Sequence, residues 1–250
     1  MSHRSVRITV RMASDITLGV LVRSILSEEL GFSNPLVRAN VLREVTDYQI
    51  TSRSIVVNLS PSDAWAQGTQ LAAIPPFSST ILTSVSVSGS MLLVLAVAAT
   101  ELDEQAARGL GWTDFYGPRA EVPVLLRSPQ VEIGDVELDE GAVLHQQGLT
   151  DAVRTFRVKA NLWFSPAETD CGIHNRHDFI ELHTQVSGHG RMQKFLSRDH
   201  GSLYEDQLLS PGNTNPVPFC LERGGAYAYP WHQYKADTNC VWLALEYHRI

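Results

Sequence analysis

The strongest constraint on the fold of this chain is a series of short apolar segments that begins at Val122 and continues to the C-terminal end. Each segment has the length and the β-branched or aromatic content of a strand, and turn residues such as Ser, Pro, Gly and Asn separate one segment from the next. Regular short strands with such turns are typical of an antiparallel sandwich or barrel. We predict strands at 122–127, 131–138, 155–164, 179–186, 191–195 and 240–247.

The first half of the chain mixes helical and strand patterns. Ser14-Asp15 can cap a helix that Gly31 ends, and Pro35 suits the first turn of a second helix. We therefore expect a mainly β protein with an N-terminal α+β domain at residues 1–118 and a β domain at residues 119–250. The elements expected in the first half are strands at 5–10 and 50–59 and helices at 15–31, 33–47, 60–65 and 101–108.

One segment has the length of a membrane span, because no charged residue occurs between Ala64 and Thr100. Within it, residues 80–88 alternate apolar with hydroxyl side chains, which is the period of a strand rather than of a helix. Ser88-Gly89-Ser90 is typical of a turn, and Met91–Ala98 has the pattern of a buried strand. We therefore predict a hairpin of two strands and no membrane partner.

Composition and charge restrict the classes of partner. Hydrophobic residues make up 44% of the chain, which is enough to bury a core, and the net charge is −7. Nucleic acid is not an expected partner, because phosphate binding requires a basic face. The three cysteines are too few and odd in number for a disulfide scaffold, so they fit a reducing compartment. No long apolar segment follows Met1, so a cytoplasmic location without a signal peptide is expected.

Histidine is unevenly distributed, since seven of the nine histidines fall between residues 174 and 248. Residues two apart in a strand share a face, so His177, Glu181 and His183 would point the same way from the strand predicted at 179–186. An ionisable face inside a small barrel is costly unless it is paired or binds a ligand. Imidazoles with one carboxylate suit Fe(II), Zn, Ni or Mn, so this face is a candidate metal site.

A second histidine element lies nearer the C-terminus, at Tyr229-Pro230-Trp231-His232. The turn around the proline delivers His232 shortly before the apolar strand predicted at 240–247. A histidine in that position can complete a metal site that begins on another strand. Tyr229 would then lie at the rim of the site.

The residues that set the spacing of the two elements are Gly172, His177, Glu181 and Gly188 in the first, and Pro230 and His232 in the second. This spacing resembles the two sequence motifs of the cupins. The resemblance covers roughly residues 122–250. It implies that the C-terminal half is a cupin barrel, a double-stranded β-helix that is jelly-roll-like.

The resemblance also implies three metal ligands, which are His177, Glu181 and His232. The fourth ligand stays open, because Asn175 stands where the motif has its first histidine. A β-bulge could turn His174 inward, Asn175 could itself face the site, or His183 could replace the missing histidine. A metal with only three protein ligands is the remaining alternative.

From this resemblance we expect a metal-dependent oxidoreductase, dioxygenase-like, that acts on a small organic acid in biosynthesis. Fe(II) is the favoured metal, because imidazoles and a carboxylate leave positions open for substrate and dioxygen. Arg191 or Gln193 would orient the carboxylate of the substrate, with Tyr229 beside them.

Three alternatives remain open at this point. With Zn or Ni the same site would act as a Lewis acid in an isomerase, cyclase or lyase, and Mn is a further candidate metal. A sensor cupin would bind a small ligand without chemistry. The N-terminal half could be a degenerate second cupin. Cupin barrels often pair across sheet edges, so the resemblance also makes a homodimer plausible.

Overall fold

The computed structural model describes residues 26–99, 102–117, 121–149, 153–217 and 219–250. It is mainly β, with 56% strand and 6% helix, as the sequence predicts. The strand expected at 5–10 and most of the helix expected at 15–31 lie outside the described residues. None of the helices in the described part of the chain combines the length and the hydropathy that a membrane-spanning helix requires.

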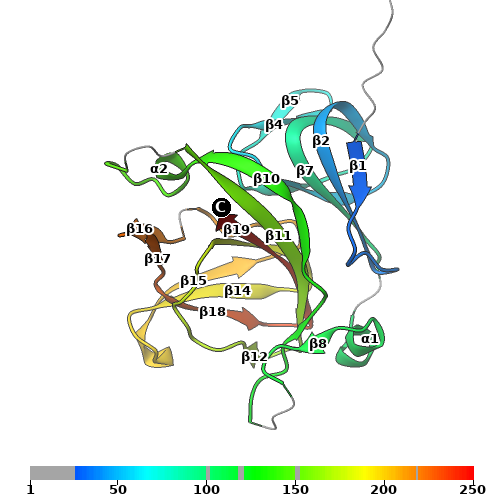
Figure 1. Ribbon diagram of the computed structural model, residues 1–250. Helices are drawn as coiled ribbons and strands as arrows, with labels where there is room; N and C mark the ends of the chain where they lie inside the picture. Colours follow the sequence, from blue (N-terminus) through cyan, green and yellow to red (C-terminus); the bar gives the residue numbers. More distant parts are fainter. Residues whose placement is uncertain (1–25, 100–101, 118–120, 150–152, 218) are drawn as a thin grey trace, which may run out of the picture.

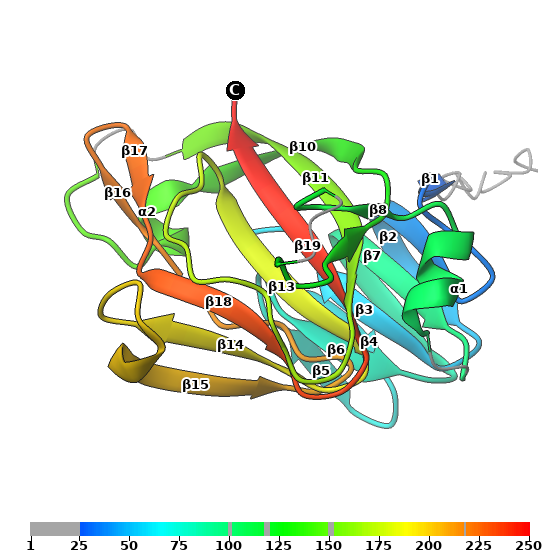
Figure 2. The same cartoon turned by 90° about the horizontal axis from the view of Figure 1, so that it is seen from below.

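The strands form three sheet layers (Figures 1 and 2). The first sheet has the order β1-β2-β7-β3-β6, with the β4–β5 ribbon attached to β7. The middle sheet has the order β13-β19-β11-β9-β8, with β10 on β11, and the third has the order β12-β18-β14-β15. In the first sheet the strands are β1 (Leu26–Glu29), β2 (Val37–Ile50), β3 (Ser54–Asn58), β4 (Ala64–Gln67), β5 (Leu71–Ile74), β6 (Ser79–Leu82) and β7 (Val85–Val97).

The remaining elements belong to the second half of the chain, apart from α1 (Glu104–Gly109) and β8 (Thr113–Asp114). The middle sheet contains β9 (Leu126–Arg127), β10 (Val131–Asp139), β11 (Val153–Ser165), β13 (Ile180–Ser187) and β19 (Cys240–Arg249). The third contains β12 (Thr169–Asp170), β14 (Gly190–Phe195), β15 (Leu203–Leu209) and β18 (Trp231–Ala236). Helix α2 (Glu140–Val143), the 3-10 turn η1 (His200–Ser202) and the ribbon of β16 (Leu221–Arg223) and β17 (Ala226–Ala228) complete the chain.

The strand order of the second half is that of a jelly roll. The segment 213–215 hydrogen-bonds to β13 through two main-chain pairs, from Gln185 N to Asn213 O and from Asn215 N to His183 O. The middle sheet therefore continues as β11-β19-β13 and this segment, and it faces β12-β18-β14-β15. Successive strands cross repeatedly between the two sheets, which is the arrangement of a two-sheet jelly roll, the architecture that cupins have.

The two faces of the middle sheet differ in character. On one face, cross-strand neighbours such as Leu182, Leu245 and Ala160 are apolar and join the hydrophobic core formed with the first sheet. Tyr247 illustrates this contact, because its hydroxyl donates to Leu59 O at 3.2 Å. The other face carries polar side chains towards the third sheet. The two halves of the chain thus share an apolar core on one face of the middle sheet. The polar residues of the opposite face are available to form a binding site.

The helix predicted at 33–47 is wrong, because these residues form a turn and most of strand β2. The side chain of Asn34 accepts hydrogen bonds from the main-chain N–H groups of Leu36 and Val37, at 2.9 and 3.1 Å. This makes 33–36 a turn rather than a helix start. Burial alternates over the first residues of β2, where Val37, Ala39 and Val41 face the core. Residues 26–29, at the end of the other predicted helix, are strand as well.

The hairpin predicted at 80–98 is wrong, because β6 and β7 do not pair with each other: β3 lies between them and pairs antiparallel with both. The turn predicted at Ser88-Gly89-Ser90 is not formed either, since strand β7 runs through these residues. The helix predicted at 60–65 is also wrong, since Ala64–Gln67 is strand β4. Helix α1 confirms the element predicted at 101–108, with Asp103 as its N-cap.

The division into domains at residues 118 and 119 stays a prediction. Strand β8 precedes that boundary and already pairs with β9 of the middle sheet. Residues 26–99 repeat the strand order of the second half: the long strands β2 and β7 continue as β2-β7-β3-β6 at one end and as β2-β7-β4-β5 at the other, so the alternative of a degenerate second cupin stays a prediction.

Candidate metal centre

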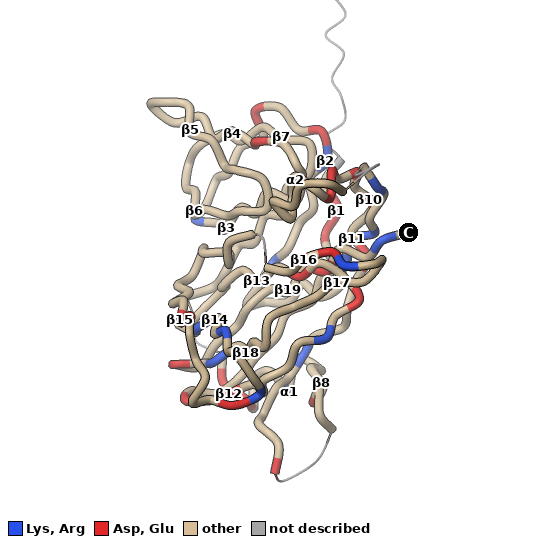
Figure 3. Tube along the Cα trace, turned by 90° about the vertical axis from the view of Figure 1, so that its left-hand side faces the viewer, with Lys and Arg blue, Asp and Glu red and all other residues tan. Residues whose placement is uncertain are grey.

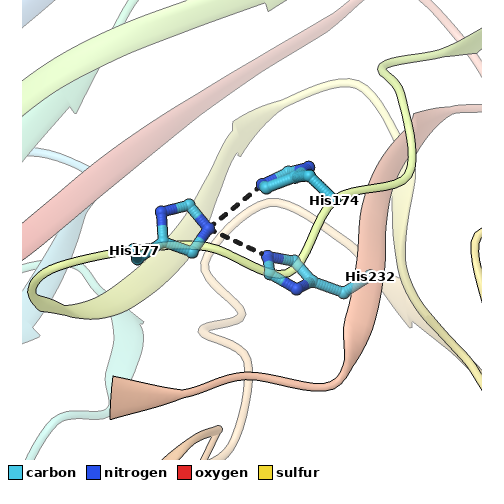
Figure 4. A group of neighbouring side chains, drawn as sticks. All are labelled: His174, His177 and His232. Carbon is cyan, nitrogen blue, oxygen red and sulfur yellow. Dashed lines mark hydrogen bonds between the residues drawn. The ribbon is translucent and has the colours of Figure 1, made fainter. Parts of the chain in front are cut away.

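Three histidine side chains converge between the middle and the third sheet (Figure 4). His232 lies on β18, and His174 forms an antiparallel bridge with it through two main-chain hydrogen bonds of 2.8 and 2.9 Å. His177 follows in the loop before β13. The Nε2 atom of His177 is 3.0 Å from Nε2 of His174 and 3.2 Å from Nε2 of His232. Each histidine therefore presents one ring nitrogen to the same point.

Hydrogen bonds to the main chain determine the tautomers of two of these rings. Nδ1 of His174 is 2.9 Å from Gly172 O, and Nδ1 of His232 is 2.9 Å from Pro230 O. A carbonyl oxygen can only accept, so both Nδ1 atoms carry the hydrogen and both Nε2 atoms present a lone pair. His177 can donate one Nε2 hydrogen to only one of them. A cation among the three nitrogens would satisfy every lone pair, and such carbonyl contacts are typical of metal-bound histidine.

Glu181, the second residue of β13, adds a carboxylate to the group. Its Oε2 atom lies 3.5 Å from Nε2 of His177 and 4.0 Å from Nε2 of His232. Oε2 is buried and has no hydrogen-bond partner among the described residues. A buried carboxylate oxygen without a partner is costly, and a metal ion would supply one. Three imidazole nitrogens and one carboxylate oxygen are a donor set that suits first-row transition metals.

The protonation states are those that metal binding requires. Burial lowers the pKa of His232 to about 3 and also lowers the pKa of His177, so both rings are neutral at neutral pH. Burial by itself would raise the pKa of Glu181, but the neighbouring His183, His177 and His232 outweigh burial and lower it. Metal ligands must be deprotonated, and His177 and His232 present neutral imidazoles beside the ionised carboxylate of Glu181.

His183, which the sequence offers as an alternative ligand, lies beside the group rather than in it. Its Nε2 atom is 3.0 Å from Oε1 of Glu181, the oxygen that points away from the histidines. Its main-chain N–H donates to the side chain of Asn215. His183 therefore orients the carboxylate. The fourth side chain of the group, which the sequence leaves open, is His174. Its main-chain bridge to His232 on β18 brings its ring towards His177 and His232.

The structure places Arg191 and Gln193 away from the histidines. In the register of β14 and β18, Gln193 is opposite Gln233, so both side chains lie on the face opposite to His232. Arg191 contacts Asp206 and Asp237, each at 2.8 Å, in a charged region of the third sheet (Figure 3). Neither side chain is placed to orient a substrate at the centre, which corrects the expectation from the sequence.

Tyr229 does lie at the centre, 4.7 Å from the His177 ring between centroids. Its hydroxyl accepts from the main-chain N–H of Glu181 and donates to Phe179 O, both at 2.8 Å. Burial raises the pKa of this hydroxyl well above its usual value. With both hydrogen bonds made to the main chain, Tyr229 holds the start of β13, and thereby Glu181, in place.

Two neighbours of the centre, Phe219 and Lys194, are not predicted from the sequence. Phe219 packs against His232 at 4.9 Å between ring centroids, and the ammonium group of Lys194 lies 5.3 Å from the centre of the Phe219 ring. Lys194 is directly opposite His232 across β14 and β18. Alternation along 190–195 indicates which side chains of that strand share a face. It does not indicate that Lys194 lies opposite His232, because the sequence predicts a turn rather than a strand at His232.

Comparisons with known proteins find only distant similarity. No model of a known protein family matches the chain, and no curated protein matches its sequence. Among solved structures, the Bacillus subtilis oxalate decarboxylase with Mn(II) centres is similar at 12% identity and a TM-score of 0.31, over 86% of this chain and 70% of that chain. The structure of Bacillus subtilis oxalate decarboxylase at pH 4.6 is similar at 12% identity and a TM-score of 0.31, over 85% of this chain and 68% of that chain.

A superposition with so low a TM-score does not support a fold assignment. The fold class is therefore assigned from the strand order and the side-chain geometry. These define a protein with a cupin-like, two-sheet jelly roll and a candidate metal centre between its sheets. The residues assembled at that centre are His174, His177, Glu181 and His232.

Acidification is expected to destabilise the metal-free protein. His232 titrates near 6.5 when unfolded and at about 3 when folded, so the unfolded state binds more protons between these values. Stability is therefore fully present above pH 6.5, and this histidine alone removes about 1.4 kcal/mol of unfolding free energy per pH unit below it. Urea unfolding of chelator-treated protein at several pH values measures the slope. A His232→Asn variant should have a shallower slope, and equal slopes would contradict this account.

Proposed function

We propose that the protein is a metal-dependent enzyme in which His174, His177, Glu181 and His232 hold the ion. One observation carries the proposal: three Nε2 atoms meet within 4.8 Å of one another, and main-chain carbonyls hold two of them with their lone pairs inward. The unpartnered oxygen of Glu181 supports it. The oxygen ligand and the neutral imidazoles fit Fe(II), which we favour.

Four protein ligands leave about two positions of a six-coordinate ion for other molecules. Fe(II) bound there would supply the activation of dioxygen for oxidation of a bound substrate, as in an oxygenase. The protein's own residues have supporting tasks. His183 holds Oε1 of Glu181, Tyr229 fixes the main chain of β13, and the ring of Phe219 excludes water from one side of His232.

We propose a small organic acid, an intermediate of biosynthesis, as the substrate. Zn, Ni or Mn would also accept three imidazoles and a carboxylate. A Lewis-acid isomerase, cyclase or lyase is therefore the second candidate, and a ligand-binding protein without chemistry is the third. Homodimerisation and a cytoplasmic location complete the proposal.

Oxygen uptake tests this proposal directly. Protein purified without metal is loaded separately with Fe(II), Zn(II), Ni(II) or Mn(II), and each form is incubated with a panel of hydroxy, keto and dicarboxylic acids. We expect oxygen consumption and a new product with the Fe(II) form only. Product formation without oxygen uptake in the Zn or Ni form would support the Lewis-acid alternative. Failure of every metal to bind would contradict a metalloenzyme.

A further inference from the structure

The middle sheet continues beyond the metal centre, from β13 across β19 to β11 (Figures 1 and 2), and its face towards the third sheet carries further polar residues. Side chains opposite each other in neighbouring strands share a face. Glu181 is therefore in one row with Glu246 and Lys159, and His183 is in the next row with Ala244 and Asn161. Lys159 and Asn161 thus lie on the same face of the sheet as the ligand Glu181, two strands away.

We propose that Lys159 and Asn161 bind the carboxylate of the substrate, and that the substrate is an organic acid extending across β19 to the metal centre. This inference rests on the proposed function, because it assigns the substrate class and the anchoring residues of the same site. It replaces Arg191 and Gln193, which point away from the centre.

Asn161 is a buried hydrogen-bond donor without an acceptor. The indole N–H of Trp163 donates to its Oδ1 at 3.1 Å, which fixes the orientation of the amide, because an indole can only donate. The amide nitrogen Nδ2 is then held in one direction, and it has no partner among the described residues. The residue is only 1% exposed. Native proteins rarely leave such a group unmatched, and a carboxylate oxygen of a ligand would be a suitable acceptor.

Lys159 is a half-buried cation whose neighbouring carboxylates are engaged elsewhere. The residues opposite it are Glu132 in β10 and Glu246 in β19. Glu246 is hydrogen-bonded to His248 at 2.8 Å, and Glu132 lies 3.6 Å from the guanidinium of Arg157. Lys159 itself forms no ion pair within the ranges that the structure describes. Its ammonium group is available to an anion that arrives from outside.

In the row of Asn161 the residue between this anchor and the metal centre is small, whereas Glu246 occupies the corresponding place in the row of Lys159. Ala244 is the only residue between His183 and Asn161 in their row, and neighbouring strands are about 4.8 Å apart, so β11 and β13 are separated by about 10 Å. The next row contains the parallel indoles of Trp163 and Trp242, 6.3 Å apart between centroids. A carboxylate at β11, an apolar middle beside the indoles and a second polar group at the metal describe the ligand class.

The test uses metal-loaded protein and a series of unbranched dicarboxylates from malonate to adipate, titrated by calorimetry. We expect at least one member to bind, and its neutral diamide to bind far more weakly. Lys159→Met removes the charge but keeps the stem. Asn161→Asp keeps the acceptor for Trp163 and replaces the donor by a carboxylate. Each should raise Kd at least about tenfold, because hydrogen bonds to charged groups are strong.

Lys235→Met is the matched control, because Lys235 is opposite Arg191 in β18 and its side chain lies on the other face of that strand from His232. Its Kd should equal that of the wild type. Metal content is measured in every variant, so loss of the metal centre is distinguished from loss of the anchors. Were no metal to bind, the same titrations of the metal-free protein would still test the anchors. Equal affinities of wild type, Lys159→Met and Asn161→Asp, equal binding of the diamide, or no binding by the wild type would overturn the inference.

Discussion

Replacing His232 by alanine is expected to abolish stoichiometric metal binding and to reduce activity by more than a hundredfold. The imidazole is 1% exposed, its Nε2 atom is 3.2 Å from that of His177, and no other side chain on β18 can replace it. Loss of a residue that only supports a ligand typically costs 10–100-fold in metal affinity, so loss of a ligand should cost more. Elemental analysis after gel filtration measures the bound metal, and circular dichroism verifies the fold.

Two further histidine variants make this experiment decisive. His200→Ala removes an exposed histidine in the 3-10 turn after β14 and should keep the full metal content. His183→Ala removes the partner of Oε1 of Glu181, so its affinity should fall by about 10–100-fold rather than vanish. Full metal content in His232→Ala, or identical losses in all three variants, would refute the assignment of the centre.

Part of this centre could be predicted from the sequence, because it depends on local spacing. Glu181 lies four residues after His177, and a proline turn precedes His232, so the three side chains could be identified without knowledge of the fold. The role of His174 could not be decided in this way. It depends on a bridge with β18 that joins residues far apart in the chain, and on Gly172, whose φ of 99° interrupts regular alternation.

The fold could be predicted where turns separate the strands. The segments expected at 131–138, 155–164 and 240–247 correspond closely to β10, β11 and β19. The segment 33–47 could not be assigned correctly, because its apolar residues also fit the spacing of a helix face. Pairing of β2 with β7 along most of its length decides the outcome, and that pairing joins residues 35 to 60 positions apart.

The sequence does not predict strand β18 either, and this affects the site. Because the pattern around Pro230 predicts a turn at His232, it does not indicate the cross-strand neighbours of this side chain. Only the register with β14 reveals that Lys194 shares its face and that Gln193 does not. Which polar residues surround the centre is therefore a tertiary property, whereas the ligands themselves are largely a local one.

Substitution of Gly188 by alanine is expected to lower the free energy of unfolding by about 2–5 kcal/mol, a large part of the 5–15 kcal/mol typical of a folded domain. Gly188 lies in the turn between β13 and β14 and has a φ of 69°. A Cβ atom there would lie 2.0 Å from the main-chain oxygen of Asn239 and 2.8 Å from the hydroxyl of Thr238. The main-chain oxygen cannot move alone, because it belongs to the turn between β18 and β19.

Gly224→Ala separates backbone strain from this collision. Gly224 has nearly the same φ, 62°, but nothing lies within 4 Å of the position of its Cβ. Its replacement should therefore cost only the left-handed strain of about 1–2 kcal/mol. Urea unfolding of both metal-free variants measures the difference. The turn at Gly188 follows β13, which carries Glu181, and the turn at Asn239 follows β18, which carries His232. Gly188→Ala should therefore also bind metal more weakly, whereas Gly224→Ala should not. Equal destabilisation by the two substitutions would show that the close approach to Asn239 contributes nothing.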